Sequence, residues 1–374
     1  MPAHADPGPI HGVYLHVPFC AGKCAYCAFY SERYTRTTAE RWLAALAREI
    51  DPWRGIHPQT IYIGGGTPSI LAPDLLERLS GLLRETFQLS PRYEWTVEAN
   101  PGSLTPDAAR SLARQGVNRI SLGAQSFHDR ELRLLNRPHN ATDIRQAVDT
   151  IRGAGIDNFN LDLLAGIPGG TAATWRNTLE QAVALQPAHV SVYALTLEEN
   201  THLMQMAGTL QIEPADDERQ LLELQLAEDL LGRAGYERYE ISNYARPGRA
   251  CRHNLDCWRG RRYLGFGPAA AGHIGMSRYQ NAPDLTAYLE ALEAGRGPPS
   301  ETELLTPELK LMEKMVFGLR MRGGVNAALV RRARAEQTMQ HLAQEGLTLY
   351  AGHRWMLTAR GRELADYVAR ELMS

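Results

Sequence analysis

From the start of the chain to about residue 235, short runs of β-branched and aromatic residues alternate with longer amphipathic segments. The short runs predict strands at Val13–Val17, Thr60–Ile63, Tyr93–Glu98, Arg119–Leu122, Asn158–Leu164 and His189–Leu195. The amphipathic segments predict helices near Ala39–Ile50, Pro73–Phe87, Pro106–Arg114, Ile144–Arg152, Thr174–Ala184 and Asp216–Ala234. Because parallel strands need crossovers of this length, the alternation predicts an α/β fold with a parallel sheet and helices outside it. The periodicity does not show whether the sheet closes into a barrel.

The pattern changes after the sixth predicted strand and again near residue 300. Residues 236–244 predict a further strand, a segment rich in Arg, Gly and His follows to residue 275, and residues 295–300 have the composition of a linker. A helix then opens at Thr306-Pro307, more helix extends to residue 345, and a hairpin and a final helix follow, an order that resembles a small winged-helix domain. We therefore divide the chain into an N-terminal tail (1–12), a core (13–235), an extension with a linker (236–300) and a C-terminal domain (301–374).

The overall composition, 44% hydrophobic and 22% charged residues, is that of an ordinary globular protein. A formal net charge of −2 gives no electrostatic reason to expect nucleic acid or an anionic membrane as a partner. Although a winged helix suggests DNA binding, we interpret Arg331, Arg332 and Arg334 as a solvated helix face. Because the sequence has no apolar run that could span a bilayer and no secretory signal in residues 1–10, we expect a cytoplasmic protein.

Three of the five cysteines, Cys20, Cys24 and Cys27, lie within eight residues that follow the first predicted strand. Thiolates at C-x3-C-x2-C spacing can each bind one iron of an iron–sulfur cluster from a single loop, in which Gly22 relaxes the turn and Tyr26 can face the cluster. Because a fourth cysteine is missing, one iron would stay open to a small molecule. The alternatives are buried core cysteines, or three ligands of a zinc site, although structural zinc is usually held by two separated ligand pairs. An odd number of cysteines with three in one loop also fits a reducing compartment better than disulfides.

This cysteine spacing, at the end of the first predicted strand, is similar to that of the radical S-adenosylmethionine (radical SAM) superfamily. The resemblance implies a 4Fe–4S cluster whose open iron chelates the amine and carboxylate of S-adenosylmethionine (SAM). Such a cluster donates one electron and breaks a carbon–sulfur bond of SAM to give a 5′-deoxyadenosyl radical. The resemblance also implies a partial (β/α)6 barrel of the TIM type. In such barrels the functional groups lie on loops at the carboxyl ends of the strands.

Polar and glycine residues follow the other predicted strands, as a binding site at that edge requires. The run Gly64–Gly66 comes after the second strand and lets the backbone approach a ligand closely. Glu98 and Asp162, at or near strand ends, can accept hydrogen bonds from hydroxyl groups. Gln125 can bridge polar groups, and Arg137 can pair with a carboxylate in fork geometry. Each of these side chains, taken alone, could equally be a surface or helix-capping group.

A set of motifs in a consistent order extends the resemblance from about residue 13 to residue 275. They are Tyr14-Leu-His16-Val-Pro-Phe-Cys20, Gly64-Gly-Gly-Thr67-Pro68, Glu98-Ala-Asn-Pro101, Arg119-Ile-Ser-Leu-Gly-Ala-Gln-Ser-Phe127, Asn136-Arg137-Pro-His139, Asp162-Leu-Leu-Ala-Gly-Ile-Pro-Gly169 and Tyr239-Glu-Ile-Ser-Asn243. Together they are similar to the motifs of the oxygen-independent coproporphyrinogen III oxidase family. The resemblance implies that the cluster is held by Cys20, Cys24 and Cys27. It implies that SAM is contacted by Tyr14, Gly65, Gly66, Thr67, Glu98, Gln125, Arg137 and Asp162.

Two departures favour the branch of this family that is described as heme chaperones, the HemW type. The decarboxylating oxidases have a further cysteine two residues after the third cluster ligand, where this chain has Phe29, and a longer segment before the first strand. The segment His253-Asn-Leu-Asp-Cys257-Trp258 is similar to the H-N-x-x-Y-W signature of the chaperones, with cysteine in place of tyrosine. His253 is therefore a candidate heme ligand, and Cys257 could replace an axial ligand or only a pocket wall. The alternatives are a histidine that packs locally, or a zinc or auxiliary-cluster site formed with Cys251.

Two functions follow from the resemblance. The first is a heme chaperone that binds a 4Fe–4S cluster, SAM and heme and passes heme to an acceptor protein, with a flavodoxin or ferredoxin as electron donor. The alternative is an oxygen-independent coproporphyrinogen III oxidase, which decarboxylates porphyrinogen propionates oxidatively in heme biosynthesis. There the protein would place the substrate and exclude solvent while the cofactor supplies the chemistry. A third option is a heme-degrading radical enzyme.

Overall fold

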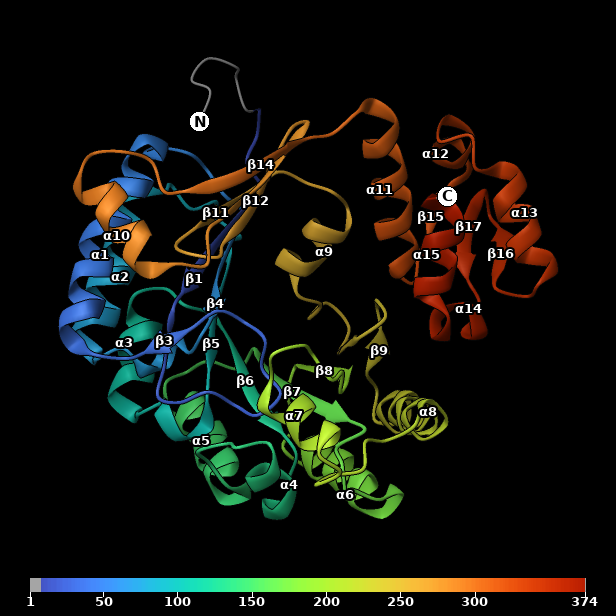
Figure 1. Cartoon of the computed structure of the whole chain (residues 1–374), viewed down its shortest axis with the longest axis horizontal. Coiled ribbons are helices and arrows are strands. Elements are labelled where there is room, and N and C mark those ends of the chain that lie inside the picture. The colour runs from blue at the N-terminus through green and yellow to red at the C-terminus, as the bar shows by residue number, and fades with distance from the viewer. Residues whose placement is uncertain (1–7, 374) are drawn as a thin grey trace.

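The computed structural model describes residues 8–373, so residues 1–7 of the predicted N-terminal tail lie outside the described residues. A large domain carries most of the chain, and a small C-terminal domain lies beside it (Figure 1). The six predicted strands are β1 (Gly12–Val17), β4 (Thr60–Gly65), β5 (Glu94–Ala99), β6 (Arg119–Gln125), β7 (Phe159–Ala165) and β8 (His189–Ala194). The six predicted helices are α1 (Arg36–Ile50), α2 (Pro73–Thr86), α3 (Pro106–Arg114), α5 (Ala141–Gly153), α6 (Ala172–Ala184) and α8 (Asp217–Arg233). The predicted α/β fold is confirmed.

Within residues 8–373 the large domain is built on a 12-stranded sheet in the order β14-β13-β12-β11-β1-β4-β5-β6-β7-β8-β10-β9. The remaining strands of this sheet are β9 (Glu237–Arg238), β10 (Asn243–Ala245), β11 (Tyr263–Phe266), β12 (Ala271–Ile274), β13 (Ser277–Asn281) and β14 (Ser300–Leu304). The strands from β11 to β8 run parallel, whereas those at both edges pair antiparallel. Because the order ends at β14 and at β9, the sheet is open, which is the partial barrel expected from the resemblance.

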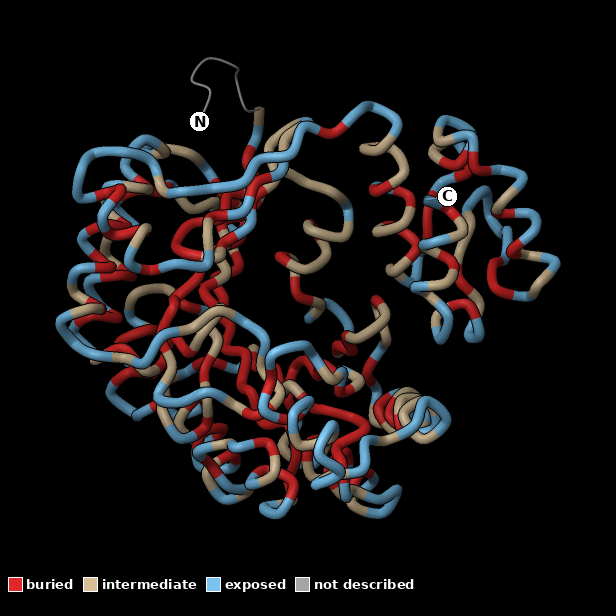
Figure 2. Tube along the Cα trace, viewed as in Figure 1, coloured by how far each residue is buried: buried red, intermediate tan, exposed pale blue. Residues whose placement is uncertain are grey.

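The two faces of the parallel strands differ, because side chains alternate between the faces and the sequence alternates with them. One face is apolar and packs against the surrounding helices, in a single cluster that includes Val13, Leu15, Ile61, Ile63, Trp95 and Val97 of the strands and Trp42, Leu46, Leu75 and Leu79 of the helices. The other face carries polar residues such as Tyr14, Tyr62, Glu98 and Asp162, which stay partly exposed. Burying each large apolar side chain contributes about 1.5–3 kcal/mol, so the outer face stabilises the barrel and the inner face is left for chemistry. Figure 2 shows the strands as the most buried part of the domain.

Helix caps place two of the loops that carry predicted site residues. Thr105 Oγ1 accepts a hydrogen bond from Ala108 N at 3.2 Å, and Pro106 follows in the first turn of α3. Helix α5 begins with a capping box in which Asn140 Oδ1 accepts from Asp143 N at 3.1 Å and Asp143 Oδ2 accepts from Asn140 N at 2.9 Å. This box fixes the chain immediately after the Asn136–His139 motif.

The segment predicted as one strand over residues 236–244 forms two short antiparallel strands instead, β9 and β10. Glu240 Oε1 accepts hydrogen bonds from Ser242 N at 2.8 Å and from Asn243 Nδ2 at 2.5 Å. These bonds fold the segment between the two strands into a turn, so a single extended strand cannot form.

The segment to residue 275 and the predicted linker belong to the large sheet. The former holds α9 (Arg252–Trp258), β11 and β12, and β11 adds a seventh parallel strand next to β1. After α10 (Leu285–Glu293), the loop at 295–299 leads into β14, which pairs with β13 over residues 300–304. The boundary that we expected at residue 301 therefore falls inside a strand, and the sheet continues to Leu304.

The C-terminal domain confirms the winged-helix-like prediction. Its order is α11 (Pro307–Arg320), β15 (Val325–Asn326), α12 (Ala327–Arg332), α13 (Glu336–Gln344), β16 (Thr348–Ala351), β17 (Arg354–Leu357), α14 (Ala359–Glu363) and α15 (Ala365–Met373). The three strands form a separate sheet in the order β15-β17-β16, and the domain has its own apolar core. None of the helices described between residues 8 and 373 has both the length and the apolar character needed to cross a membrane.

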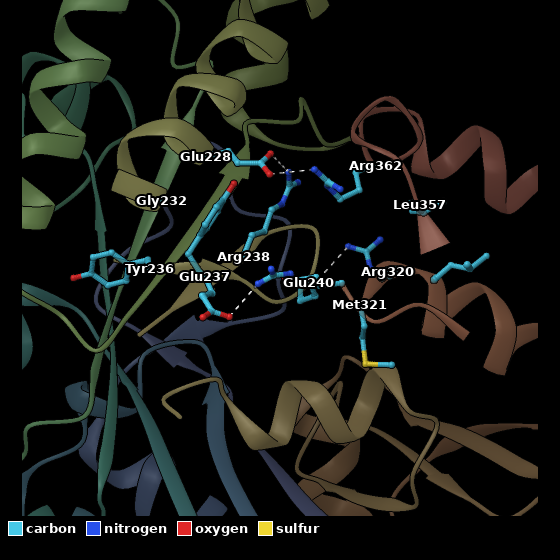
Figure 3. Close-up of a pocket in the computed structure, with 13 residues that line it drawn as sticks. Glu228, Gly232, Tyr236, Glu237, Arg238, Glu240, Arg320, Met321, Leu357 and Arg362 are labelled. Carbon is cyan, nitrogen blue, oxygen red and sulfur yellow. Dashed lines mark hydrogen bonds and ion pairs between the residues drawn. The ribbon is translucent and has the colours of Figure 1, made fainter. Parts of the chain in front are cut away.

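Ion pairs join the C-terminal domain to the barrel around a cavity of about 410 Å³ (Figure 3). Glu228 of α8 accepts from Arg238 at 2.7 Å and from Arg362 of α14 at 3.1 Å. Glu237 of β9 pairs with Arg322, which follows α11, at 3.0 Å. The pairs of Arg362 and Arg322 therefore connect elements of the two domains.

Candidate functional site

The loop that carries Cys20, Cys24 and Cys27, called the cysteine loop, follows β1, and backbone hydrogen bonds to neighbouring segments hold it in place. The strand β2 (Phe19–Cys20) pairs with β3 (Glu32–Arg33) and closes the loop. In the middle of the loop, Ala25 N donates to Leu135 O at 3.0 Å, and Ala25 O accepts from Leu203 N at 2.7 Å. The supports come from the chain after α4 (Asp129–Leu134) and from α7 (His202–Gly208). An apolar cluster of Ala25, Leu135, Leu164, Ile167, Leu195 and Leu203 lies at this support, with Tyr26 packed against it.

The three sulfur atoms lie in a polar and cationic environment. Cys20 Sγ is 3.4 Å from Thr67 Oγ1, and Cys24 Sγ accepts a hydrogen bond from Arg137 Nη1 at 3.3 Å. Burial raises the pKa of Cys27, a backbone hydrogen bond at Phe29 opposes the rise, and the charge of Cys24 adds to it. All three cysteines are free and partly exposed. Three partly exposed cysteines in one loop, one of them beside a guanidinium, are donors of the kind that an iron–sulfur cluster requires.

The donor set of this loop is compatible with an iron–sulfur cluster. Among residues 8–373, no group of three His, Cys, Asp or Glu side chains converges closely enough to hold one ion. A 4Fe–4S cluster does not require such convergence, because each cysteine ligates a different iron. The donor set, three thiolates from one loop, therefore matches the cluster that the resemblance implies.

Arg137 is the centre of a hydrogen-bond network above the sheet. Its Nη2 donates to Gly123 O at 2.7 Å and to Asn100 Oδ1, and its Nη1 donates to Cys24 Sγ. Asn100 Nδ2 in turn donates to Thr67 Oγ1 at 2.9 Å. Because both terminal nitrogens are engaged, Arg137 does not present the free carboxylate fork that we expected. Its Nε is buried and lacks a hydrogen-bond partner within the described residues.

The glycine run after β4 leaves no room for side chains. A Cβ at Gly66 would lie 2.5 Å from Phe19 O, and one at Gly64 would lie 2.7 Å from the carboxylate of Glu98. Gly65 adopts φ +101°, which favours glycine, and a Cβ there would lie 2.5 Å from His16. The run therefore packs its backbone against the cysteine loop and Glu98, and its close approach to a ligand stays a prediction.

Glu98 and Asp162 are both held on the inner face of the sheet with raised pKa values. Glu98 Oε1 accepts from Tyr62 Oη at 2.7 Å, and Oε2 accepts from Gly65 N at 3.3 Å. Burial raises the pKa of Glu98 to about 7, against the effect of the Tyr62 hydrogen bond, and the charge of Asp162 adds to the rise. Asp162 accepts from Asn160 at 2.7 Å and from Ser121 at 3.2 Å, and burial raises its pKa. Two nearby carboxyl groups with raised pKa values mark this face of the sheet as a candidate functional site.

Tyr14 and Gln125 complete the set of predicted residues. His16 Nε2 donates to Tyr30 O at 2.9 Å, so His16 Nδ1 accepts from Tyr14 Oη at 3.2 Å. Burial raises the pKa of Tyr14, and the charge of Glu98 raises it further. Gln125 ends β6 with φ +67°, and its Nε2 would lie 3.1 Å from a Cβ at Gly123. The structure thus brings together all eight residues that we expected to contact SAM.

Several residues of this network were not predicted as site residues. Asn100 connects Thr67 to Arg137, and Tyr62 and Asn160 hold the two carboxyl groups. The position of Asn100 in the Glu98–Pro101 motif was a usable signal. Tyr62 and Asn160 follow from period-two spacing, because each lies two residues from another inner-face residue on its own strand.

His253 lies at the other end of the barrel. It is 6% exposed, and its Nδ1 is 2.9 Å from Thr60 Oγ1 at the start of β4. The ring packs beside those of Tyr62 and Tyr263, and burial, with a smaller effect of Arg119, lowers the pKa of His253 to about 4. These contacts favour the alternative of a histidine that packs locally, and heme ligation by His253 stays a prediction.

The predicted alternative of a site formed by Cys251, His253 and Cys257 has no convergent geometry. Cys251 Sγ donates to Glu94 Oε1 at 3.5 Å, and His253 binds Thr60. Cys257 instead lines a separate cavity with residues of β12 and α11.

Residues 14–182 match the family model of the radical SAM superfamily. The chain is 36% identical over 378 residues to the heme chaperone HemW of Mycobacterium tuberculosis, which covers 98% of this chain and 96% of that protein. It is 36% identical over 271 residues to the heme chaperone HemW of Escherichia coli, 71% of each chain. The solved structure of coproporphyrinogen III oxidase (HemN) from Escherichia coli, a radical SAM enzyme, superposes with a TM-score of 0.85 at 24% identity, over 98% of this chain and 90% of that one, which shows a shared fold. Length, identity and fold agree, and this chain belongs to the HemW family of radical SAM proteins.

Proposed function

We propose that this protein is a heme chaperone that holds a 4Fe–4S cluster and SAM, binds heme and delivers it to an acceptor protein. The observation that carries the proposal is the similarity over the whole chain to proteins named heme chaperone HemW. Phe29, at the position where the oxidases have a further cysteine, supports the same branch. Its side chain is 71% exposed on the cysteine loop, so it is free of any packing role there.

The residues of the loop would hold the cluster and set its charge. Cys20, Cys24 and Cys27 would each ligate one iron, and Arg137 would offset the negative charge of the thiolates through its contact with Cys24. Thr67 Oγ1 can donate to the Cys20 sulfur, a contact of the kind that tunes cluster potentials. When bound, the cluster supplies a single electron to SAM.

The other residues at this end would hold SAM against the cluster. Gly65 and Gly66 would keep this loop in place beside SAM, because only glycine fits against His16 and Phe19 O there. Glu98 and Asp162 would accept hydrogen bonds from ligand hydroxyls, and Tyr14 and Gln125 would close the sides. The partly exposed inner face gives SAM access to these groups.

We further propose a cytoplasmic location, with a flavodoxin or ferredoxin as electron donor. The number of cysteines and their crowding in one loop support a reducing compartment. The exposed Phe29 next to the cluster loop offers a contact for a redox partner.

The test is anaerobic reconstitution followed by two assays. The reconstituted protein should contain about four iron atoms per chain, bind SAM, and give a Soret band on titration with hemin. Replacing Cys20, Cys24 and Cys27 together by serine should abolish iron loading, whereas the control Cys251→Ser, at the far end of the barrel, should load normally. Turnover of coproporphyrinogen III to a decarboxylated product in the presence of SAM and reductant would contradict the chaperone function and favour the oxidase.

A further inference from the structure

A second cavity, of about 330 Å³, lies between α9 and β11–β13 of the barrel and α11 of the C-terminal domain. In Figure 1, α9 and α11 face one another at this place. Its walls include three aromatic side chains, Trp258, Tyr263 and Phe317. The rings of Trp258 and Phe317 lie edge to face at 6.0 Å, and Trp258 Nε1 is buried with no hydrogen-bond partner in the part of the chain that the structure describes. Aromatic walls with an unpaired donor favour a flat, largely apolar ligand that also carries acceptors.

The cavity also has an excess of positive charge. Lys310, Glu313, Lys314 and Phe317 recur along one face of α11, and all four line the cavity. Glu313 is paired with Arg278 at 2.5 Å, which leaves the two lysines without a carboxylate partner among the described residues. Lys314 is exposed. Two cations beside aromatic walls favour a ligand that has carboxylates at its edge.

Two side chains that line the cavity, His273 and Cys257, can ligate iron, and they differ in their protonation at neutral pH. Burial, then the charges of Lys310 and Arg278, lower the pKa of His273 to about 4, so its imidazole is neutral and has a lone pair that can accept a donor or a metal. Burial raises the pKa of Cys257 to about 12, so its sulfur carries a proton. Lys310 Nζ contacts His273 Nε2 directly, as a cation that donates to that lone pair. His273 is thus the better iron ligand of the two at neutral pH.

We propose that this cavity is the heme site, in which His273 ligates the iron and Lys310 and Lys314 bind the propionates. The inference rests on the proposed function and names the site that serves it. When Lys310 turns to a propionate, it leaves His273 Nε2 free for the iron. A cavity of this size is at the small end of ligand sites, about 300–1,000 Å³, so part of the porphyrin would stay outside, as release to an acceptor requires.

This assignment differs from ligation by His253. His253 is buried behind Tyr263 and already bound to Thr60, whereas His273 lines an open cavity. It also gives the C-terminal domain a role, because α11 supplies both lysines. The cavity therefore exists only while that domain is docked on the barrel.

The test compares hemin with iron-free protoporphyrin IX in titrations of the full-length protein. His273→Ala should remove the Soret shift of hemin and leave protoporphyrin binding unchanged, and added imidazole should restore the shift. The double variant Lys310→Ala/Lys314→Ala should lower the affinity for hemin and for protoporphyrin IX by about tenfold or more, because both porphyrins carry the propionates. The matched controls are His353→Ala, an exposed histidine, and Arg331→Ala/Arg332→Ala, which removes two exposed cations from α12.

The outcomes separate this site from the function on which it rests. Binding of hemin by all four variants as by the wild type would overturn the site and leave the heme-binding function in place. A wild-type protein that binds neither porphyrin would overturn both. Loss of the Soret shift in a folded His253→Ala variant, with His273→Ala unchanged, would assign the iron to His253 and overturn the site.

Discussion

Glu98→Gln is expected to stabilise the SAM-free protein at alkaline pH and to weaken SAM binding. The pKa of Glu98 is raised from 4.5 to about 7, so its charged form costs up to ~3 kcal/mol of folding free energy. Because the folded pKa is above the unfolded one, the stability present below pH 4.5 is lost as the pH rises to about 7. Glutamine has no charge to bury, but its amide nitrogen cannot accept from Gly65 N, a loss of about 1 kcal/mol. The net gain should be about 2 kcal/mol at pH 8 and about zero at pH 5.

The assay is urea unfolding of the cluster-free protein, followed by tryptophan fluorescence at several pH values between 5 and 8. The buried histidines also titrate in this system, but they are common to both proteins and cancel in the difference. Asp162 is coupled to Glu98 through its charge, so both proteins are also compared with Asp162→Asn in place. Glu77→Gln on the exposed side of α2 is the control and should give no pH-dependent difference. A difference between wild type and Glu98→Gln that does not change with pH would refute the reasoning. Isothermal titration of SAM should show the opposite effect, a loss of affinity, if Glu98 contacts the ligand.

Two further substitutions test the packing of the site and the place of the predicted heme ligand. Gly66→Ala places a Cβ 2.5 Å from Phe19 O, so it should lower the free energy of unfolding by about 1–3 kcal/mol and reduce iron loading. The control Gly22→Ala, whose Cβ would have no atom within 4 Å, should leave the free energy of unfolding and the iron content unchanged. Equal iron content in both variants would contradict the close approach. His253→Ala should lower the free energy of unfolding in urea by about 2–4 kcal/mol, because it leaves a cavity and an unpaired Thr60 hydroxyl, and a value near zero would show that the ring has no structural role.

The strands of the core were predictable because each carries a strong local signal. In Thr60–Gly65 and Glu94–Ala99, β-branched or aromatic residues form an unbroken run, and a turn residue follows. The strand at Tyr263–Phe266 has four residues in a segment rich in Gly and Arg, and its partner β1 lies about 250 positions earlier in the sequence. No local pattern encodes such a pairing, so the extension of the sheet beyond β1 was missed.

The candidate site was predictable for a related reason. Carboxyl ends of parallel strands meet at one edge, so residues that follow different strands, such as Glu98 and Gln125, must come together. The sequence has no comparable signal for how far along the barrel axis a residue outside these strands lies. The sequence places His253 in a motif but does not show that α9 carries it to the start of β4, far from the cysteines. Nor does the sequence show that both terminal nitrogens of Arg137 donate to protein atoms, because the position of the side chain depends on where α5 begins.

The two proposed sites lie at opposite ends of the same strands, and this separation has a physical consequence. The cysteine loop follows Val17 at the carboxyl end of β1, whereas Tyr263, in the wall of the second cavity, pairs with Gly12 at the amino end. Six residues at about 3.3 Å each put roughly 20 Å between the two ends. Heme at the amino end therefore cannot contact SAM or the cluster directly. The polar inner face of the barrel lies between them, and there Tyr62 joins the two ends, because its hydroxyl donates to Glu98 and its ring packs on His253, which binds Thr60.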